Sequence, residues 1–282
     1  MSYLKRYRRQ IAEFRAAVDT GIVIYSMGRV GSKTILRALE KAGIAVVHVH
    51  WLAGFYPFRV PNYRFFPDNR LIRASREFLR VRRRMILKRG VRKSRPVRIV
   101  TGVRDPFDRD ISHMFLDLPS LLPLAAFGED AFADSSAPEF LWNVYEGLVN
   151  KEYATGYFDK EFLPVLGADL YGMDFDRHEG WGIYRRDNLS ILVLRMDRLA
   201  DNLDVINDFT GAKIDCLDVV NSGARKWYAC LYREFLGDFS LDPRIVECVY
   251  NSRYVRKFFT PDQIREKRRR FGEMKKEPER HV

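Results

Sequence analysis

The sequence has few cysteines and no long apolar run. We expect the three cysteines, an odd number without metal-site spacing, to be buried, reduced thiols: Cys216, Cys230 and Cys248. No apolar run approaches the roughly 18 residues that a membrane-spanning helix needs. The basic start, Met1–Arg15, lacks the apolar core of a signal peptide. These absences predict a cytoplasmic protein and disfavour a disulfide-rich secreted domain.

Basic residues are abundant and unevenly distributed. The net charge is +12, and Arg70–Arg98 holds thirteen Lys or Arg residues against one acid, Glu77. This segment therefore accounts for the whole excess. Such a concentrated field favours an anionic partner, either an acidic glycan or a membrane surface, with nucleic acid less favoured. A solvated basic helix without a partner explains the same pattern equally well.

The apolar pattern at the start of the chain predicts an α/β protein. Ile22–Tyr25 is short, β-branched and typical of a buried strand. Ser32–Ala42 has helical spacing and ends before Gly43, and a second strand is expected over Ile44–His50. A strand, a helix and a strand in this order predict a parallel sheet with right-handed crossovers.

The rest of the chain continues the alternation of strands and helices. Asp105 should cap a helix that has Pro106 at its first position. We expect one domain over residues 1–282, with an aromatic and basic insertion at 53–96 and a charged, frayed tail at 261–282. The other expected elements are a basic helix at 71–89, strands at 97–103, 182–186 and 190–194, a loop at 119–136, a helix at 139–150, a helix capped by Asp197 and ended by Gly211, and helices from Trp227 onward.

The loop between the first strand and its helix has the composition of a phosphate-binding loop. Its glycines can turn backbone N–H groups toward an anion, and the helix N-terminus adds a positive end. Two cations, Arg29 and Lys33, and two hydroxyl donors, Ser32 and Thr34, add to these groups. The predicted phosphate-binding residues are Gly28, Arg29, Val30, Gly31, Ser32, Lys33 and Thr34. The loop is not a Walker A motif, because Ser32 separates Gly31 from Lys33. A metal-dependent triphosphatase is therefore disfavoured.

A second candidate phosphate element follows the strand at 97–103. Arg104 leaves the end of that strand, and Ser112 lies two helical turns further on. The carboxyl ends of parallel strands face one crevice in a doubly wound sheet. We therefore expect Arg104 and Ser112 to share a ligand with the loop around Gly28.

This pair of elements resembles the sulfotransferases that use 3′-phosphoadenosine 5′-phosphosulfate. In that family a Lys/Arg-x-Gly-Ser/Thr loop binds the 5′-phosphosulfate, and an Arg with a Ser eight residues later binds the 3′-phosphate. The stretch Arg29–Thr34 and the pair Arg104 and Ser112 fit both elements. The resemblance implies a P-loop-like three-layer fold and no requirement for a metal. Many relatives carry lysine at the position of Arg29.

Segments later in the chain resemble a bacterial branch of that family, the capsular polysaccharide synthesis proteins. They are Gly182–Tyr184, Leu192–Arg195 and Asn221–Tyr232. The resemblance implies that Lys226 or Arg225 closes over the nucleotide, and that Arg225, Lys226 and Trp227 belong to the cofactor-binding residues.

Sulfuryl transfer requires a base for the acceptor hydroxyl and a cation on the departing phosphate. The resemblance implies Arg29 or Lys33 as the cation. His48 and His50 share one face of the second strand at its carboxyl end, and histidine has a suitable pKa for the base. We favour His50, with His48 as its partner or substitute. His113 is a weaker candidate, and His178 and His281 are expected in a loop and in the tail.

The acceptor is predicted only by class. The aromatic stretch Trp51–Phe66 follows the histidines and predicts either a groove for the faces of a sugar or a flap of the core. With the basic helix beyond it, the charge fits an anionic glycan acceptor, and a small-molecule acceptor stays open. Two other functions stay open, a small-molecule kinase and a basic membrane- or nucleic-acid-binding scaffold with an inactive nucleotide site.

Overall fold

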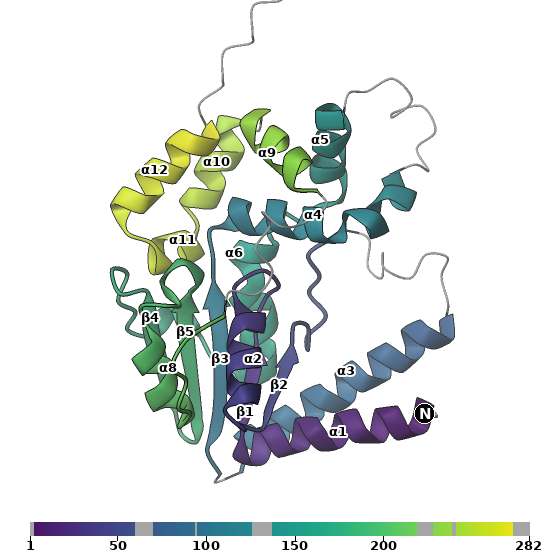
Figure 1. Cartoon of the computed structure of the whole chain (residues 1–282), viewed down its shortest axis with the longest axis vertical. Coiled ribbons are helices and arrows are strands. Elements are labelled where there is room, and N and C mark those ends of the chain that lie inside the picture. The colour runs from purple at the N-terminus through teal and green to yellow at the C-terminus, as the bar shows by residue number, and fades with distance from the viewer. Residues whose placement is uncertain are drawn as a thin grey trace, which may run out of the picture.

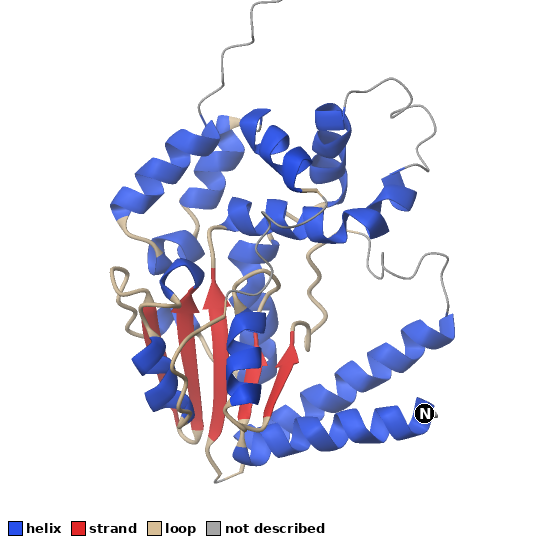
Figure 2. Ribbon diagram, viewed as in Figure 1, coloured by secondary structure: helices blue, strands red, loops and turns tan. Residues whose placement is uncertain are grey.

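The computed structural model of the chain describes residues 3–59, 70–93, 95–125, 137–218, 228–238 and 241–272. A five-stranded sheet with helices on both faces forms its centre (Figures 1 and 2). The strands are β1 (Ile22–Tyr25), β2 (Val46–Val49), β3 (Val97–Val103), β4 (Trp181–Arg186) and β5 (Leu189–Arg195). The order is β2-β1-β3-β5-β4, and only β4 runs antiparallel to its neighbour. The expected α/β class with a mainly parallel sheet is confirmed.

The sheet reverses its strand order beside β1. The chain passes from β1 to β2 on one side and then returns to place β3 on the other side. The carboxyl ends of β1 and β3 therefore border the crevice where ligands bind in doubly wound sheets. These are the two strand ends that carry the candidate phosphate elements.

Alternating side chains of β1 supply two separate cores. Ile22 and Ile24 pack with helices α2 (Ser32–Lys41) and α8 (Leu203–Thr210) on one face. Val23 and Tyr25 lie in the larger core on the other face, which includes residues of α1 (Tyr3–Thr20), α4 (Pro106–Ala125) and α6 (Tyr153–Tyr157). Burial on both faces explains why the strands read as continuous apolar runs.

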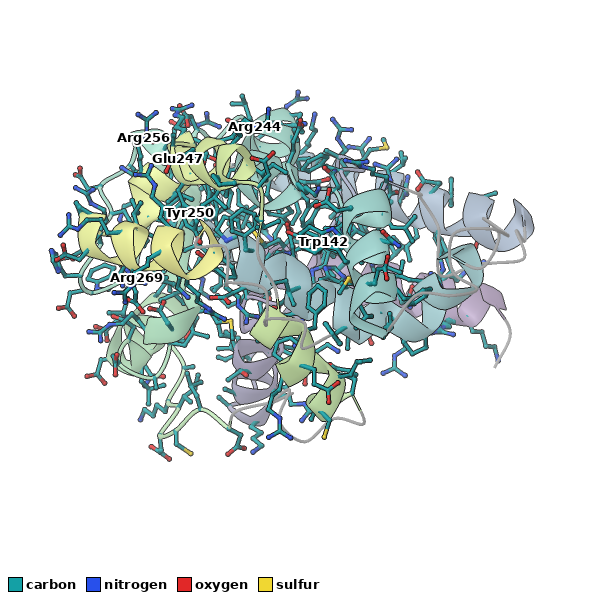
Figure 3. The ribbon with its side chains drawn as sticks, turned by 90° about the horizontal axis from the view of Figure 1, so that it is seen from above. Trp142, Arg244, Glu247, Tyr250, Arg256 and Arg269 are labelled. Atoms are coloured by element: carbon teal, nitrogen blue, oxygen red, sulfur yellow. The ribbon has the colours of Figure 1, made fainter. Side chains whose placement is uncertain are left out.

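The remaining helices either continue α6 along the larger core or lie toward the two ends of the sheet. They are α3 (Arg70–Val91), α5 (Ala137–Leu148), α7 (Leu163–Leu166), α9 (Ala229–Asp238), α10 (Pro243–Tyr250), α11 (Arg253–Phe258), α12 (Pro261–Gly272), the π-helix η2 (Phe158–Phe162) and the 3₁₀ helices η3 (Leu170–Gly172) and η4 (Met196–Arg198). Helices α4, α5, α9, α10 and α12 lie beyond the carboxyl ends of the parallel strands, whereas α1 and α3 project from the opposite end (Figure 1). Figure 3 looks down on α10 and α12, with Tyr250 labelled.

Helix α4 is longer than its sequence indicates. The loop expected from Pro119 is wrong as far as Ala125, because α4 continues through two prolines to that residue. Leu118 and Leu121 are buried in the main core, and their packing outweighs the backbone hydrogen bond that proline removes. Residues 126–136 lie outside the described ranges.

Two predictions near helix ends are wrong. Asp197 does not cap α8, which begins at Leu203; it lies in η4 and accepts a 2.7 Å hydrogen bond from Nε of the buried Arg195. The segment from Pro261 does not fray before Gly272, because it forms α12 and buries Phe271 against Phe107 at 5.3 Å between ring centroids. Residues 273–282 lie outside the described ranges.

The cysteines are exposed, which corrects the expectation of buried thiols. Cys230 and Cys248 lie on outward-facing positions of α9 and α10, whose buried positions are held by larger apolar side chains such as Phe235 and Val246. Cys216 lies in the exposed segment after α8.

Candidate functional site

The loop between β1 and α2 is held close to β3 and to the segment after β5. Gly31 precedes α2 with a positive φ of 78°, and a Cβ there would stand 2.3 Å from Cδ1 of Leu199. A Cβ on Gly102 of β3 would stand 2.8 Å from the carbonyl oxygen of Val30. Glycine at both positions therefore lets the loop lie against β3 and against the segment after β5.

The two candidate phosphate elements are in direct contact. Arg29 has a left-handed φ of 73°, and its Nε donates a 2.8 Å hydrogen bond to Oγ of Ser112. Nη1 of Arg104 donates to the carbonyl oxygen of Arg29 at 3.1 Å. A non-glycine residue in this backbone region is strained, and such strain clusters at functional sites. The structure thus brings together three of the predicted site residues.

Positive charge is concentrated at this contact. Burial, followed by the charge of Arg104, lowers the pKa of the Arg29 guanidinium, and Tyr228 and Tyr232 beside α9 partly offset this shift. Two guanidiniums that repel one another in a partly buried position are stabilised by an anion placed between them. The arrangement is therefore suited to a phosphate group.

The C-terminal helices fix the turn that carries Arg104. The hydroxyl of Tyr254 accepts from the Arg104 N–H at 3.0 Å and donates to the Arg104 carbonyl at 2.9 Å. Asp105 caps α4 by accepting from the Asp108 N–H at 3.0 Å, and it accepts from the Tyr250 hydroxyl at 2.8 Å. Burial raises the pKa of Asp105 to about 6, with a further contribution from the nearby Asp108. The predicted cap is confirmed.

His48 and His50 lie side by side at the end of β2, as their spacing predicted. Their ring centroids are 4.3 Å apart, and both rings contact Ser26 at the start of the loop. Nδ1 of His50 lies 2.6 Å from the Ser26 carbonyl oxygen, which can only accept, so Nδ1 carries a proton and, in the neutral ring, Nε2 carries the lone pair. Burial, followed by the fields of His50 and Lys33, lowers the pKa of His48 well below its usual value.

The two candidate leaving-group cations have separate positions. Arg29 extends to Ser112, on the side of the second phosphate element. Lys33 is exposed in the first turn of α2, and its charge contributes to the lowered pKa of His48. Lys33 is therefore the cation nearer to the histidines.

A buried polar chain behind the loop was not predicted. Arg109 is 0% exposed and donates from Nε to the Gly28 carbonyl at 3.2 Å, while its guanidinium lies 4.2 Å from the ring centroid of Tyr153. Its Nη2 contacts Nδ1 of His113, whose Nε2 lies 3.0 Å from Asp117. His113 thus supports the loop from within the core, a placement that favours a structural role over a base.

A second unpredicted residue, Glu161 of η2, holds the segment that follows His50. Its buried carboxylate accepts from the Tyr25 hydroxyl at 2.5 Å and from three backbone N–H groups at 2.6–2.8 Å, those of Leu52, Ala53 and Phe55. Glu161 therefore ties the end of β1 to the aromatic segment. π-helical turns of this kind recur at functional sites.

Replacing Glu161 by alanine should lower the free energy of unfolding by at least about 3 kcal/mol, because two buried and two partly buried donors lose their acceptor, and each buried donor costs roughly 1–3 kcal/mol. Glu161→Gln keeps one amide oxygen and should cost less. The matched control is Glu152→Gln, because Glu152 forms an exposed 3.1 Å ion pair with Lys160. Denaturant unfolding measures all three variants. A Glu161→Ala protein as stable as the control would contradict the assignment.

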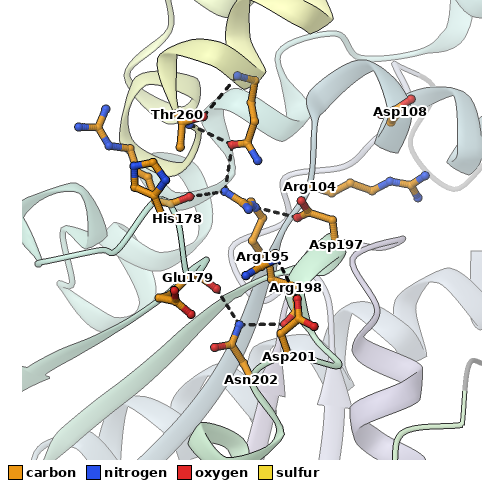
Figure 4. A network of polar contacts seen from close by, with 12 residues as sticks. Arg104, Asp108, His178, Glu179, Arg195, Asp197, Arg198, Asp201, Asn202 and Thr260 are labelled. Carbon is orange, nitrogen blue, oxygen red and sulfur yellow. Dashed lines mark hydrogen bonds and ion pairs between the residues drawn. The ribbon is translucent and has the colours of Figure 1, made fainter.

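A third buried charge joins β5 to the C-terminal helices (Figure 4). Arg195 is 2% exposed and donates to Asp197 at 2.7 Å, to the Arg177 carbonyl at 2.6 Å and to Oε1 of Gln263 in α12 at 3.0 Å. In the same view the Arg104 side chain extends away from this network. Arg195 therefore stabilises the junction between the end of β5 and α12, which is part of the framework around the site.

Several predicted residues are not at the described site. Arg225, Lys226, Trp227 and His281 lie outside the described residues, as does part of the stretch Trp51–Phe66. His178 lies in an exposed turn after β-bridge residue Asp176, as expected for a loop position. The described part of the aromatic stretch packs on α6, with Phe55 stacked on Tyr153 at 5.2 Å and Nε1 of Trp51 donating to the Tyr153 hydroxyl at 2.9 Å.

Comparison with known proteins gives one result. Residues 136–260 match the family model described as "Putative capsular polysaccharide synthesis protein". The match supports the capsular branch of the resemblance. No curated protein and no solved structure matches the chain. In the described ranges, no helix is both long and apolar enough to cross a membrane.

The matched segment, residues 136–260, makes up somewhat less than half of the chain and includes neither candidate phosphate element. It contains Glu161, Arg195 and Tyr254, each of which holds a strand end or the segment after it. It also contains the predicted residues 225–227. The matched segment therefore supplies three supports of the candidate site, whereas β1, α2, β3 and α4 carry the candidate phosphate elements.

Proposed function

We propose that this protein is a sulfotransferase that moves a sulfuryl group from 3′-phosphoadenosine 5′-phosphosulfate to a hydroxyl or amine of a glycan. The observation that carries the proposal is the contact of the two phosphate elements, Arg29 with Ser112 and Arg104 with the Arg29 carbonyl. One ligand with two separate phosphate groups matches two linked anion sites. A P-loop-like classification of the fold is part of the same proposal.

The two phosphate groups of the sulfuryl donor are assigned to different residues, one to the loop and the other to the two arginines with Ser112. The backbone of Gly28–Thr34, together with the positive N-terminal end of α2, would hold the phosphosulfate. Arg104, Ser112 and Arg29 would hold the 3′-phosphate, because Nε of Arg29 donates to Oγ of Ser112 and Nη1 of Arg104 donates to the Arg29 carbonyl. Arg225, Lys226 and Trp227 remain predicted contacts to the nucleotide.

The chemistry needs one base and one cation. The donor supplies an activated sulfur–oxygen bond; the acceptor oxygen bonds to sulfur, and the bridging phosphate oxygen leaves with the electron pair. Nε2 of His50 takes the acceptor proton, since Nδ1 is committed to the Ser26 carbonyl. Lys33 stabilises the charge of the departing phosphate. His48 stays neutral beside His50 and limits the local positive charge.

The acceptor class rests on the capsular match and on the aromatic segment after His50. A polysaccharide hydroxyl fits both. Trp51 and Tyr56 are partly buried, with ring centroids 5.3 Å apart, and offer flat apolar faces near the proposed base. The acceptor therefore approaches from the side of β2.

Calorimetric titration with adenosine 3′,5′-bisphosphate tests the donor site directly. We expect micromolar binding of the bisphosphate and much weaker binding of ATP with magnesium. Preference for ATP would indicate a kinase. Absence of binding to either nucleotide would contradict a nucleotide site and favour the scaffold.

A further inference from the structure

Helices α1 and α3 form a paired unit that projects from the sheet beside β2, here named the α1–α3 arm (Figure 1). The helices run parallel, since Tyr7 stacks on Phe78 at 5.6 Å near one end and Val18 meets Gly90 near the other. Phe14 is buried at the middle of the seam, with the Arg83 guanidinium 5.7 Å from its ring centroid. The arm is therefore an ordered element with a defined outer surface.

The outer surface of the arm carries a stripe of exposed apolar side chains. Phe78 is 61% exposed, Val81 45% and Met85 40%. Their spacing of three and four residues places them on one face of α3. The fourth large hydrophobic exposed in the described ranges, Leu163, stands next to Pro164, whose carbonyl accepts from Arg84 of α3. Large apolar exposure thus concentrates around α3.

Cations border this stripe. A hollow of about 450 Å³ lies between the helices, and Arg8, Arg15 and Arg82 line it together with apolar side chains that include Phe78. By sequence, α1 holds five Lys or Arg against two acids, and α3 holds nine against one. The acid of α3, Glu77, is paired with Arg80. The surface therefore combines a strong positive field with apolar side chains that are 40–61% exposed.

We propose that the α1–α3 arm docks on an anionic phospholipid surface. Phe78, Val81 and Met85 enter the boundary between headgroups and acyl chains, and the arginines of the hollow contact lipid phosphates. A soluble polyanion accounts for the arginines but gains nothing from three exposed apolar side chains. The apolar stripe therefore decides in favour of lipid. This proposal does not depend on the sulfotransferase proposal.

Vesicle co-sedimentation of the full chain tests the docking. We expect binding to phosphatidylcholine vesicles that contain phosphatidylglycerol and little binding to phosphatidylcholine alone. Phe78→Ser, Val81→Ser and Met85→Ser combined should weaken binding at least about tenfold without changing the net charge. Arg8→Gln, Arg15→Gln and Arg82→Gln combined should weaken it about a hundredfold, since each basic residue near an anionic surface contributes roughly fivefold.

The matched control removes three exposed arginines of the C-terminal helices, Arg233→Gln, Arg244→Gln and Arg265→Gln, and should bind like the parent protein. Circular dichroism confirms that all variants fold. Absence of binding to the anionic vesicles overturns the proposal. Binding that the serine variant keeps and that heparin competes away also overturns it, and assigns the arm to a soluble polyanion.

Discussion

Replacing Arg104 by alanine should weaken the binding of adenosine 3′,5′-bisphosphate at least about tenfold. Arg104 is half-buried just after the end of β3, its guanidinium donates to the Arg29 carbonyl, and its charge contributes to the lowered pKa of Arg29. We expect affinity to fall at least about tenfold if Arg104 makes one charge-assisted hydrogen bond to the ligand and about a hundredfold if it makes two. Calorimetric titration of parent and variant measures the loss.

The phosphate that Arg104 binds can be identified with a second nucleotide. Adenosine 5′-monophosphate lacks the 3′-phosphate, so the parent should prefer the bisphosphate and Arg104→Ala should lose most of that preference. Arg37→Ala is the control for net charge, because Arg37 is exposed on α2. Equal loss of both nucleotides in Arg104→Ala would contradict the assignment and indicate that Arg104 only positions the Arg29 carbonyl.

The convergence of the phosphate elements could be predicted because it follows from topology. The short β-branched run Ile22–Tyr25 and the helix after it specify a βαβ unit. In a parallel sheet the end of β1 must face the same edge as the end of β3, and β1 does pair with β3. Arg29, Arg104 and Ser112 meet for this reason, although 83 positions separate Arg29 from Ser112.

The supports of the site could not be predicted because they depend on buried charges with distant partners. Glu161 accepts from backbone groups more than 100 positions away, and Arg109 donates to the Gly28 carbonyl 81 positions away. Backbone N–H and carbonyl groups occur at every residue, so no residue type marks them as partners. A charged residue in an apolar helix indicates burial at most.

The wrong predictions of secondary structure also arise from contacts between distant parts of the chain. Pro119 marks a helix end when local chemistry decides, but α4 continues because Leu118 and Leu121 are buried. Asp197 has the residue type of a cap, yet the buried Arg195 takes its carboxylate. In both cases tertiary packing outweighs a local preference that sequence alone can express.

Replacing His50 by asparagine should lower kcat by about 10²–10⁴-fold, the range for removal of a general base. The asparagine amide can still donate to the Ser26 carbonyl, as Nδ1 of His50 does, but nothing replaces Nε2. Bisphosphate affinity should therefore stay within about threefold, because the support of the loop is retained. The assay follows transfer of labelled sulfate from the donor to a capsular polysaccharide.

His48→Asn is the matched variant. Burial lowers the pKa of His48 and keeps its ring neutral, and its Nε2 lies 3.5 Å from Oγ of Ser26. It can tune His50 through the 4.3 Å ring contact, so we expect a smaller fall in kcat, about tenfold or less. A larger loss in His48→Asn than in His50→Asn, with both proteins still binding the bisphosphate, would transfer the role of base to His48. Full activity in both variants, with donor binding intact, would show that the reaction needs neither histidine. The assignment of the nucleotide site would stand in that case.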